Sequence, residues 1–240
     1  MGIEITLIIV FLLSLILAVA AYYMLLLTES GALVAIVVGY TVGALGGLDW
    51  LIVMVIFACA GLLATRLGLG RSKDEETSER NHLNVMGVGI PLVLIACLNG
   101  LDQYFLNGEY AFTLQIAFIT ALAVATADTL ASEIGIKDRK VWMITTFERV
   151  KRGTNGGISA LGLLVSLVSS IAISVIAWFI LIDGGIGVGI AIPIALGFLG
   201  SLLDSLLGAT LETRGTISKY TNNCISAIIC SMIAILVLLI

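Results

Sequence analysis

The sequence predicts an all-α fold, a polytopic membrane helix bundle of about eight transmembrane helices, with residues 1–240 forming a single integral membrane domain. Hydrophobic residues make up 60% of the chain and charged residues only 12%, whereas soluble domains carry about 25% charged residues. Apolar runs long enough to cross a bilayer recur along the chain. The lipid bilayer is therefore the expected environment, and no nucleic-acid partner is expected.

The apolar runs give eight candidate spans, in chain order 3–27, 31–48, 50–65, 85–99, 111–136, 156–182, 186–211 and 223–240. The first lacks a basic leading region and is too long for a signal peptide, so we expect a retained helix. The fourth is short and contains Gly87, Gly89 and Pro91. This pattern predicts a broken or re-entrant helix, which is tolerated where protein or water covers the backbone. The role of the segment 81–100 stays open.

Basic residues occur in only three of the connections between these runs. They are Arg66, Arg71, Lys73 and Arg80 after the third run, Lys137, Arg139, Lys140, Arg149, Lys151 and Arg152 after the fifth, and Arg214 and Lys219 after the seventh. The positive-inside rule places these three connections in the cytoplasm and both termini outside. The alternation also supports an even number of spans.

Three acids stand within or at the end of apolar runs: Asp128 and Glu133 in the fifth and Asp204 in the seventh. A carboxylate at the bilayer centre costs roughly 2.5–3.5 kcal/mol on insertion scales, so a functional role is the default interpretation. In the expected orientation all three lie toward the cytoplasmic side. We therefore predict Asp128, Glu133 and Asp204 as catalytic residues and metal ligands. Mg²⁺ is the expected cofactor, because it takes one or two carboxylates together with phosphate oxygens.

Helical spacing refines this picture. Asp128 and Glu133 are five residues apart, about 140° around a helix, so they meet one ligand only obliquely or at different depths. The seventh run carries one stripe of small and acidic residues at helical spacing: Gly197, Ser201, Asp204, Gly208 and Glu212. Small residues beside an acid allow a neighbouring helix to approach closely.

A glycine-rich segment, 153–159, precedes the sixth run. It lacks the Lys-Ser or Lys-Thr of a P-loop, but its glycines expose backbone N–H groups and the following helix adds its positive end, a combination that suits a phosphate. The predicted substrate-binding residues are Ser132, Arg149, Lys151, Arg152, Gly153, Thr154, Asn155, Gly156, Gly157, Ser159, Asn222 and Asn223.

Each of these features also has a purely structural interpretation. Asp128 or Asp204 could pair with a basic residue and hold helices together. The segment 153–159 could be an ordinary helix cap, in which Thr154, Asn155 or Ser159 accepts helix N–H groups.

Four motifs resemble the integral-membrane phytyl-phosphate kinase family, also called the polyprenyl-phosphate kinase or transmembrane protein 19-like family. They are ADTLASEIG at 127–135, GTNGGIS at 153–159, GSLLDSLLGAT at 200–210 and Asn222-Asn223. The similarity runs from about residue 31 onward. It implies a membrane-embedded kinase or phosphotransferase acting on a lipid phosphate at the cytoplasmic face. The expected partners are a nucleoside triphosphate, with CTP as the expected donor, and a prenyl monophosphate such as phytyl or geranylgeranyl phosphate, which becomes the diphosphate.

Three other activities remain open from the sequence. A secondary transporter or proton-coupled carrier also uses membrane carboxylates and glycine-interrupted helices. An isoprenoid alcohol kinase would need one carboxylate as a general base. A lipid cytidylyltransferase would share the nucleotide and the lipid phosphate but release pyrophosphate. The prenyl chain length, the nucleotide base and the oligomeric state stay open, with a homodimer as one alternative.

Overall fold

The computed structural model describes residues 3–66, 80–183 and 185–240; Arg71 and Lys73 of the charge pattern lie outside them. Eight helices in these ranges are long and apolar enough to cross a membrane, which confirms the predicted bundle. The long helices are α1 (Ile3–Tyr23), α2 (Glu29–Gly46), α3 (Leu48–Arg66), α4 (His82–Phe105), α5 (Ala111–Gly135), α6 (Ala160–Leu181), α7 (Ala191–Leu207) and α8 (Lys219–Leu239). A 3₁₀ turn, η1 (Val188–Ile190), precedes α7, and a π-helical turn, η2 (Gly208–Glu212), follows it.

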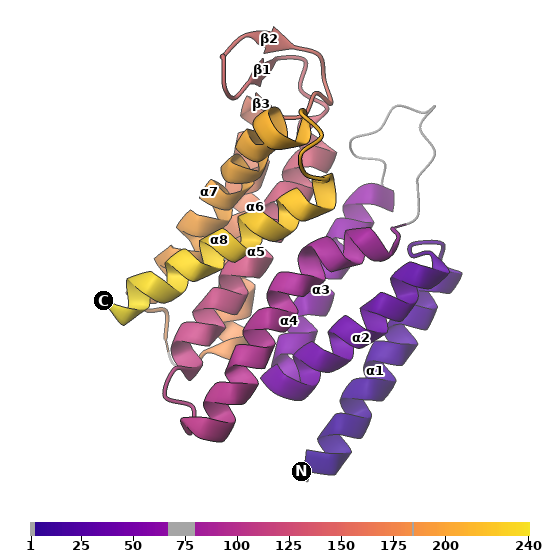
Figure 1. The fold of residues 1–240 in the computed structure, drawn as a ribbon, viewed down its shortest axis with the longest axis vertical. Coiled ribbons are helices and arrows are strands. Elements are labelled where there is room, and N and C mark those ends of the chain that lie inside the picture. The colour runs from indigo at the N-terminus through magenta and orange to yellow at the C-terminus, as the bar shows by residue number, and fades with distance from the viewer. Residues whose placement is uncertain (1–2, 67–79, 184) are drawn as a thin grey trace.

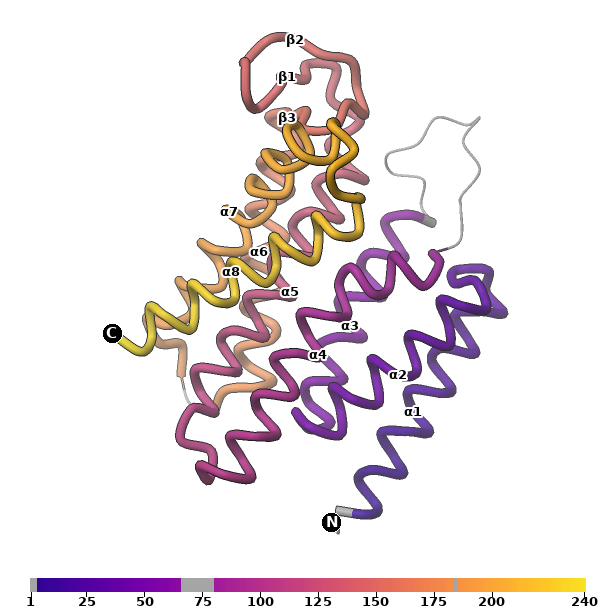
Figure 2. Tube along the Cα trace, viewed as in Figure 1, coloured from indigo at the N-terminus to yellow at the C-terminus, as the bar shows by residue number. Residues whose placement is uncertain are grey.

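The core of the bundle is built around α5, which contacts α3, α4, α6, α7 and α8 and runs through the middle of the trace in Figure 2. Phe118 of α5 is fully buried, and its ring lies 4.2 Å from that of Trp50 in α3, measured between centroids. Gly200 of α7 packs directly on Val124 of α5, leaving no room for a side chain. Because its neighbours enclose α5, the acids near its end face protein rather than lipid.

The fourth span is one continuous helix of 24 residues, with the buried Pro91 inside it. Asn81 and Asn84 form a reciprocal capping box at its start. Its glycines serve close packing: a Cβ on Gly87 would lie 2.9 Å from the carbonyl oxygen of Tyr220 in α8, and one on Gly89 would lie 2.8 Å from Val38 in α2. The expectation of a broken or re-entrant fourth segment is therefore wrong.

A small antiparallel sheet that the sequence did not predict lies between α5 and α6. Its strands are β1 (Val141–Met143), β2 (Arg149–Val150) and β3 (Gly157–Ser159), in the order β2-β1-β3. Val141 pairs with Val150 on one side and with Ser159 on the other. The sixth span consequently begins at Ala160, after a strand, and not within the glycine-rich segment. Ser159 caps it, since its hydroxyl accepts the N–H of Gly162 at 3.1 Å.

One end of the bundle gathers the predicted functional segments. The end of α3, the start of α4, the sheet and the turn between α7 and α8 all lie at this end, while the turn between α4 and α5 lies at the other (Figure 1). We call the first the sheet end of the bundle. Its assignment to the cytoplasm stays a prediction from the charge pattern.

Candidate functional site

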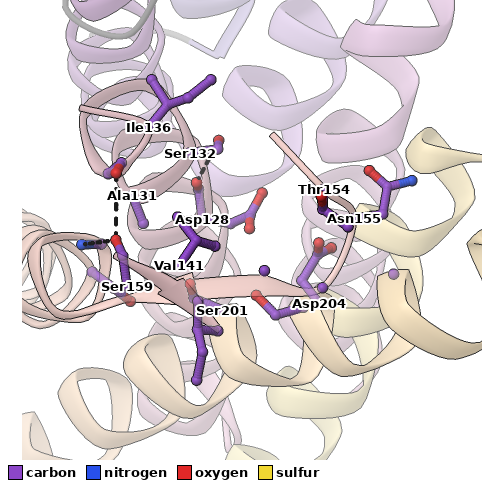
Figure 3. A pocket seen from close by; sticks show the side chains of 18 of the residues that line it. Asp128, Ala131, Ser132, Ile136, Val141, Thr154, Asn155, Ser159, Ser201 and Asp204 are labelled. Carbon is purple, nitrogen blue, oxygen red and sulfur yellow. Dashed lines mark hydrogen bonds between the residues drawn. The ribbon is translucent and has the colours of Figure 1, made fainter. Parts of the chain in front are cut away.

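A cavity of about 320 Å³ opens at the sheet end, between α5, α6, α7 and the glycine-rich segment. Figure 3 shows Asp128, Thr154, Asn155, Ser201 and Asp204 around it. The structure thus brings together two acids from different spans and the segment 153–159, which are distant in the sequence. The stripe predicted on the seventh span faces the same space, since Ser201, Asp204, Gly208 and Glu212 all line the cavity.

Asp204 is fixed by two asparagines at the start of α8. The buried Asn222 donates from Nδ2 to the Asp204 carbonyl at 2.9 Å and to its Oδ1 at 3.2 Å. Asn223, with its amide in the orientation that satisfies both of its ends, donates to Asp204 Oδ2 at 3.1 Å and to the carbonyl of Lys219 at 3.0 Å. Asn222 and Asn223, predicted as substrate-binding residues, therefore donate hydrogen bonds to the carboxylate of Asp204.

Glu212 also enters the site, through the π-helical turn that ends at it. Such turns are rare and occur frequently at functional sites. Asn155 donates to Glu212 Oε1 at 2.9 Å, and Asn222 donates to its Oε2 at 3.3 Å. Glu212 thereby joins the glycine-rich segment to α8. The sequence placed it on the stripe but did not predict it as a site residue.

The glycine-rich segment turns through two residues in the left-handed region, Gly153 at φ 76° and Gly156 at φ 77°. Gly156 packs against Ala209 of η2 so closely that a Cβ would lie 2.8 Å from the Cα of Ala209. The N–H of Thr154 bonds to Lys151 and that of Gly157 bonds to Thr154.

Three further residues of this segment, Gly153, Asn155 and Gly156, line the cavity. No described residue accepts a hydrogen bond from the N–H of Gly153, Asn155 or Gly156. Three unused donors beside a cavity can bind an anion.

The basic residues of the site differ from those predicted. Arg149, Lys151 and Arg152 are exposed and do not line the cavity, and Arg149 instead lies over the ring of Trp142, 5.6 Å from its centroid. Lys219, the first residue of α8, lines the cavity in their place. The structure therefore does not bring Arg149, Lys151 and Arg152 to the cavity, and the cation that lines it comes from another connection.

Glu133 lies at the edge of the cavity, but its carboxylate is bound elsewhere. Its Oε1 accepts a hydrogen bond from Thr65 of α3 at 3.1 Å, and Arg80 donates to the same Thr65 hydroxyl at 3.4 Å. These contacts tie α5 to α3 and to the start of α4. Glu133 therefore has a structural contact through Oε1, and its catalytic role stays a prediction.

Several predicted substrate-binding hydroxyls are already used within the fold. Ser132 donates to the carbonyl of Asp128 at 2.9 Å, Thr154 to that of Lys151 at 2.7 Å, and Ser159 to that of Gly135 at 3.3 Å. Ser166 of α6, which the sequence did not indicate, has 1% of its surface exposed, lines the cavity and has no hydrogen-bond partner. A buried hydroxyl normally has a partner, so Ser166 has an unused donor at the wall of the cavity.

A magnesium ion fits this site only together with a ligand. Within residues 3–66, 80–183 and 185–240, no three His, Cys, Asp or Glu side chains form a ready metal-binding group. Asp128 and Asp204 line one cavity and interact electrostatically with each other. Since Mg²⁺ commonly takes one or two carboxylates and completes its shell with phosphate oxygens and water, these two are the residues that would hold it.

Asp138 braces the connection that carries the glycine-rich segment. Its Oδ1 accepts the N–H of Lys140 at 3.0 Å and its Oδ2 accepts the N–H of Leu161, in the first turn of α6, at 3.3 Å. These backbone hydrogen bonds, first that from Lys140, lower the pKa of Asp138 below its usual value. The ionised carboxylate therefore fastens the loop to the start of α6.

Comparison with known proteins identifies relatives over most of the chain. A family model described as integral membrane protein DUF92 matches residues 12–233. An uncharacterised membrane protein of Methanocaldococcus jannaschii is 31% identical over 88% of this chain and 85% of its own length. Protein PGR of Arabidopsis thaliana is 31% identical, covering 68% of this chain and 64% of its own. Protein VTE6, chloroplastic, of the same plant is 25% identical, covering 89% and 65%. No solved structure matches.

Proposed function

The chain belongs to the integral membrane protein DUF92 family, and from this premise we propose that it transfers a phosphoryl group from a nucleoside triphosphate to an isoprenoid monophosphate. One observation carries the proposal: a single cavity holds carboxylates from separate spans, a lysine and three unused backbone N–H groups. This combination suits the binding of phosphates with a divalent cation. The motif resemblance to phytyl-phosphate kinases supports the prenyl acceptor and CTP as the donor.

The reaction is a simple displacement. An oxygen of the acceptor monophosphate forms a bond to the γ-phosphorus, and the bond from that phosphorus to the β–γ bridging oxygen breaks. The nucleoside diphosphate leaves with the bonding electrons, and the acceptor becomes a diphosphate. A phosphate monoester has a second pKa near 6, so at neutral pH the attacking oxygen is largely ionised and needs no general base.

The main barrier is then the repulsion between two anions, and catalysis depends on positioning and charge neutralisation. Mg²⁺ bound by Asp128 and Asp204 would neutralise charge on the transferred group. Asn222 and Asn223 hold the Asp204 carboxylate in one orientation. The free N–H groups of Gly153, Asn155 and Gly156 provide fixed donors to phosphate oxygens, and such preorganised dipoles need not reorganise during the reaction.

The position of the cavity suits a lipid acceptor. It lies at the sheet end of a bundle whose long helices have the length and hydropathy of membrane spans. A prenyl phosphate keeps its chain in the bilayer and its headgroup at the surface, so the headgroup arrives at the depth of the cavity. We propose that this end faces the cytoplasm, where the nucleotide is available.

The test is a turnover assay with purified protein in nanodiscs, Mg²⁺, CTP or ATP, and either geranylgeranyl monophosphate or geranylgeraniol, with products identified by mass. The proposal expects geranylgeranyl diphosphate and a nucleoside diphosphate. Phosphorylation of geranylgeraniol alone would indicate an alcohol kinase, and pyrophosphate release a cytidylyltransferase. No turnover of any prenyl substrate would overturn the proposal and favour a carrier.

A further inference from the structure

The cavity is lined by several acids but, among the described residues, by a single basic side chain, that of Lys219. The cations that the sequence placed beside the glycine-rich segment lie outside the cavity. A site for phosphates that relied on those residues would leave its interior without a fixed positive charge. Among the described lining residues, Lys219 therefore provides the positively charged side chain of this cavity.

The backbone of Lys219 is held firmly. Its carbonyl oxygen accepts a hydrogen bond from Asn223 at 3.0 Å, and the preceding Ser218 caps α8 by accepting the N–H of Thr221 at 3.2 Å. Asn223 also binds Asp204, so one amide sets both the acid and the start of the lysine. The Cα of Lys219 thus has a fixed position relative to the carboxylate.

The ammonium group of Lys219, in contrast, is not committed to a protein partner. Lys219 interacts electrostatically with Asp128 and Asp204, but no ion pair within 4.0 Å joins it to an acid in the part of the chain that the structure describes. A lysine ammonium carries three donors and no acceptor. These donors remain available to a ligand that enters between the lysine and the two acids.

Other walls of the same cavity also carry unused donors. The buried hydroxyl of Ser166 has no partner, and the N–H groups of Gly153, Asn155 and Gly156 are not taken up by the described residues. Donors from several elements around one cavity match the several acceptor oxygens of a phosphate group. Resting on the proposed function, we propose that Lys219 binds a substrate phosphate group inside this cavity.

The binding experiment compares wild-type protein in nanodiscs with Lys219→Met, Lys219→Arg and the control Lys137→Met. Lys137 is exposed and does not line the cavity, so the control makes the same chemical change outside the site. The ligands are geranylgeranyl monophosphate, its uncharged parent geranylgeraniol, and CTP with Mg²⁺, each titrated alone by calorimetry. Unchanged binding of geranylgeraniol would show that a variant still binds the prenyl chain. An unchanged melting temperature would show that it is still folded.

Loss of one charge-assisted hydrogen bond weakens binding by about ten- to a hundredfold. We expect Lys219→Met to lose about that much affinity for the monophosphate or for CTP, with geranylgeraniol binding unchanged and Lys219→Arg keeping most of the affinity. The ligand that is affected identifies the phosphate that Lys219 holds.

Two outcomes would overturn the assignment, and they are distinguishable. If the wild type binds a phosphate ligand and Lys219→Met binds it equally well, Lys219 only balances Asp128 and Asp204, while the proposed function stands. If the wild type binds neither the monophosphate nor CTP, both the assignment and the proposed function are wrong.

Discussion

Asn222 binds Asp204 twice, once through the main-chain carbonyl of Asp204 at 2.9 Å and once through its Oδ1 at 3.2 Å. The same amide reaches Glu212 at 3.3 Å. One buried side chain therefore couples α8 to α7 and to the π-helical turn. This contact fixes the geometry of the acidic wall of the cavity.

Replacing Asn222 with leucine should destabilise the protein. The change leaves the half-buried carboxylate of Asp204 with fewer donors, which costs about 1–3 kcal/mol. Chemical unfolding in detergent, followed by tryptophan fluorescence, measures the loss. The control is Thr216→Val, an exposed threonine between α7 and α8, expected within about 0.5 kcal/mol of wild type. Equal stabilities for the two variants would contradict a structural role for Asn222.

Substitutions of the three predicted acids should differ in their effect on enzymatic activity. Asp128→Asn and Asp204→Asn should each lower kcat by about a hundredfold or more, because both carboxylates line the cavity and are proposed to hold the Mg²⁺ that would offset the negative charge of the transferred group. Glu133→Gln should stay within about tenfold of wild type, since its carboxylate bonds to Thr65. Initial rates at saturating Mg²⁺ give the comparison. A Glu133→Gln variant as inactive as Asp204→Asn would restore Glu133 to the catalytic set.

Two glycines with similar backbone angles provide a matched pair. Alanine at Gly156 (φ 77°) or at Gly215 (φ 72°) meets the same left-handed strain, about 1–2 kcal/mol. Only Gly156 also touches Ala209; a Cβ on Gly215 would meet nothing within 4 Å. Gly156→Ala should therefore push the segment off the π-helical turn, break the bond between Asn155 and Glu212, and abolish turnover. Gly215→Ala should keep its activity, and a similar loss in both would attribute the effect to backbone strain alone.

The stabilisation that the Asp138 carboxylate gives to the loop between α5 and α6 should depend on pH. Its pKa is lower in the fold than in the unfolded chain, so its contribution is fully present above the unfolded value of about 3.9 and is lost as the pH falls through the folded pKa. At neutral pH, Asp138→Ala should speed hydrogen exchange at Leu161 and across 153–159. Protection that is unchanged in this variant would show that the loop is held by the sheet alone.

The orientation of the bundle can be tested by labelling in intact cells. Cysteine would be introduced at Thr145 in the β1–β2 turn or at Glu109 between α4 and α5, after replacing Cys59, Cys97, Cys224 and Cys230 with alanine. The charge pattern predicts that a membrane-impermeant maleimide labels position 109 and spares position 145 until the cells are opened. The reverse pattern would place the cavity outside the cytoplasm.

The sequence predicted the features that depend on long stretches of the chain. The length of the apolar runs predicts the spans. The positions of the basic residues between the runs predict that the polar site residues lie toward the same side of the membrane. The meeting of Asp128, Asp204 and the segment 153–159 at one cavity follows from these two patterns. The family resemblance is likewise carried by motifs of seven to eleven residues, long enough to be specific.

Local geometry was less predictable. Strands of two or three residues, such as β2, are too short to show an alternating pattern. Pro91 and its glycines indicated a break, but the helix continues through Pro91, and Gly87 instead allows the close approach of Tyr220. Proximity in sequence favoured Lys151 over Lys219, although side-chain direction decides which cation lines a cavity. The helical spacing of the seventh run placed Glu212 on the same face as Asp204, but nothing in the sequence indicated the π-helical turn that ends at Glu212 or its hydrogen bonds to Asn155 and Asn222.

The enclosure of α5 by five other helices bears on the biosynthesis of the protein. Translation delivers Asp128 to the membrane before α6, α7 and α8 have been made, so this segment first meets lipid without three of its final neighbours. Stable insertion of α5 then depends on helices that follow it in the chain. In a polypeptide terminated after α5, this helix and its acids would lack the contacts with α6, α7 and α8. We expect membrane quality control to degrade such a polypeptide.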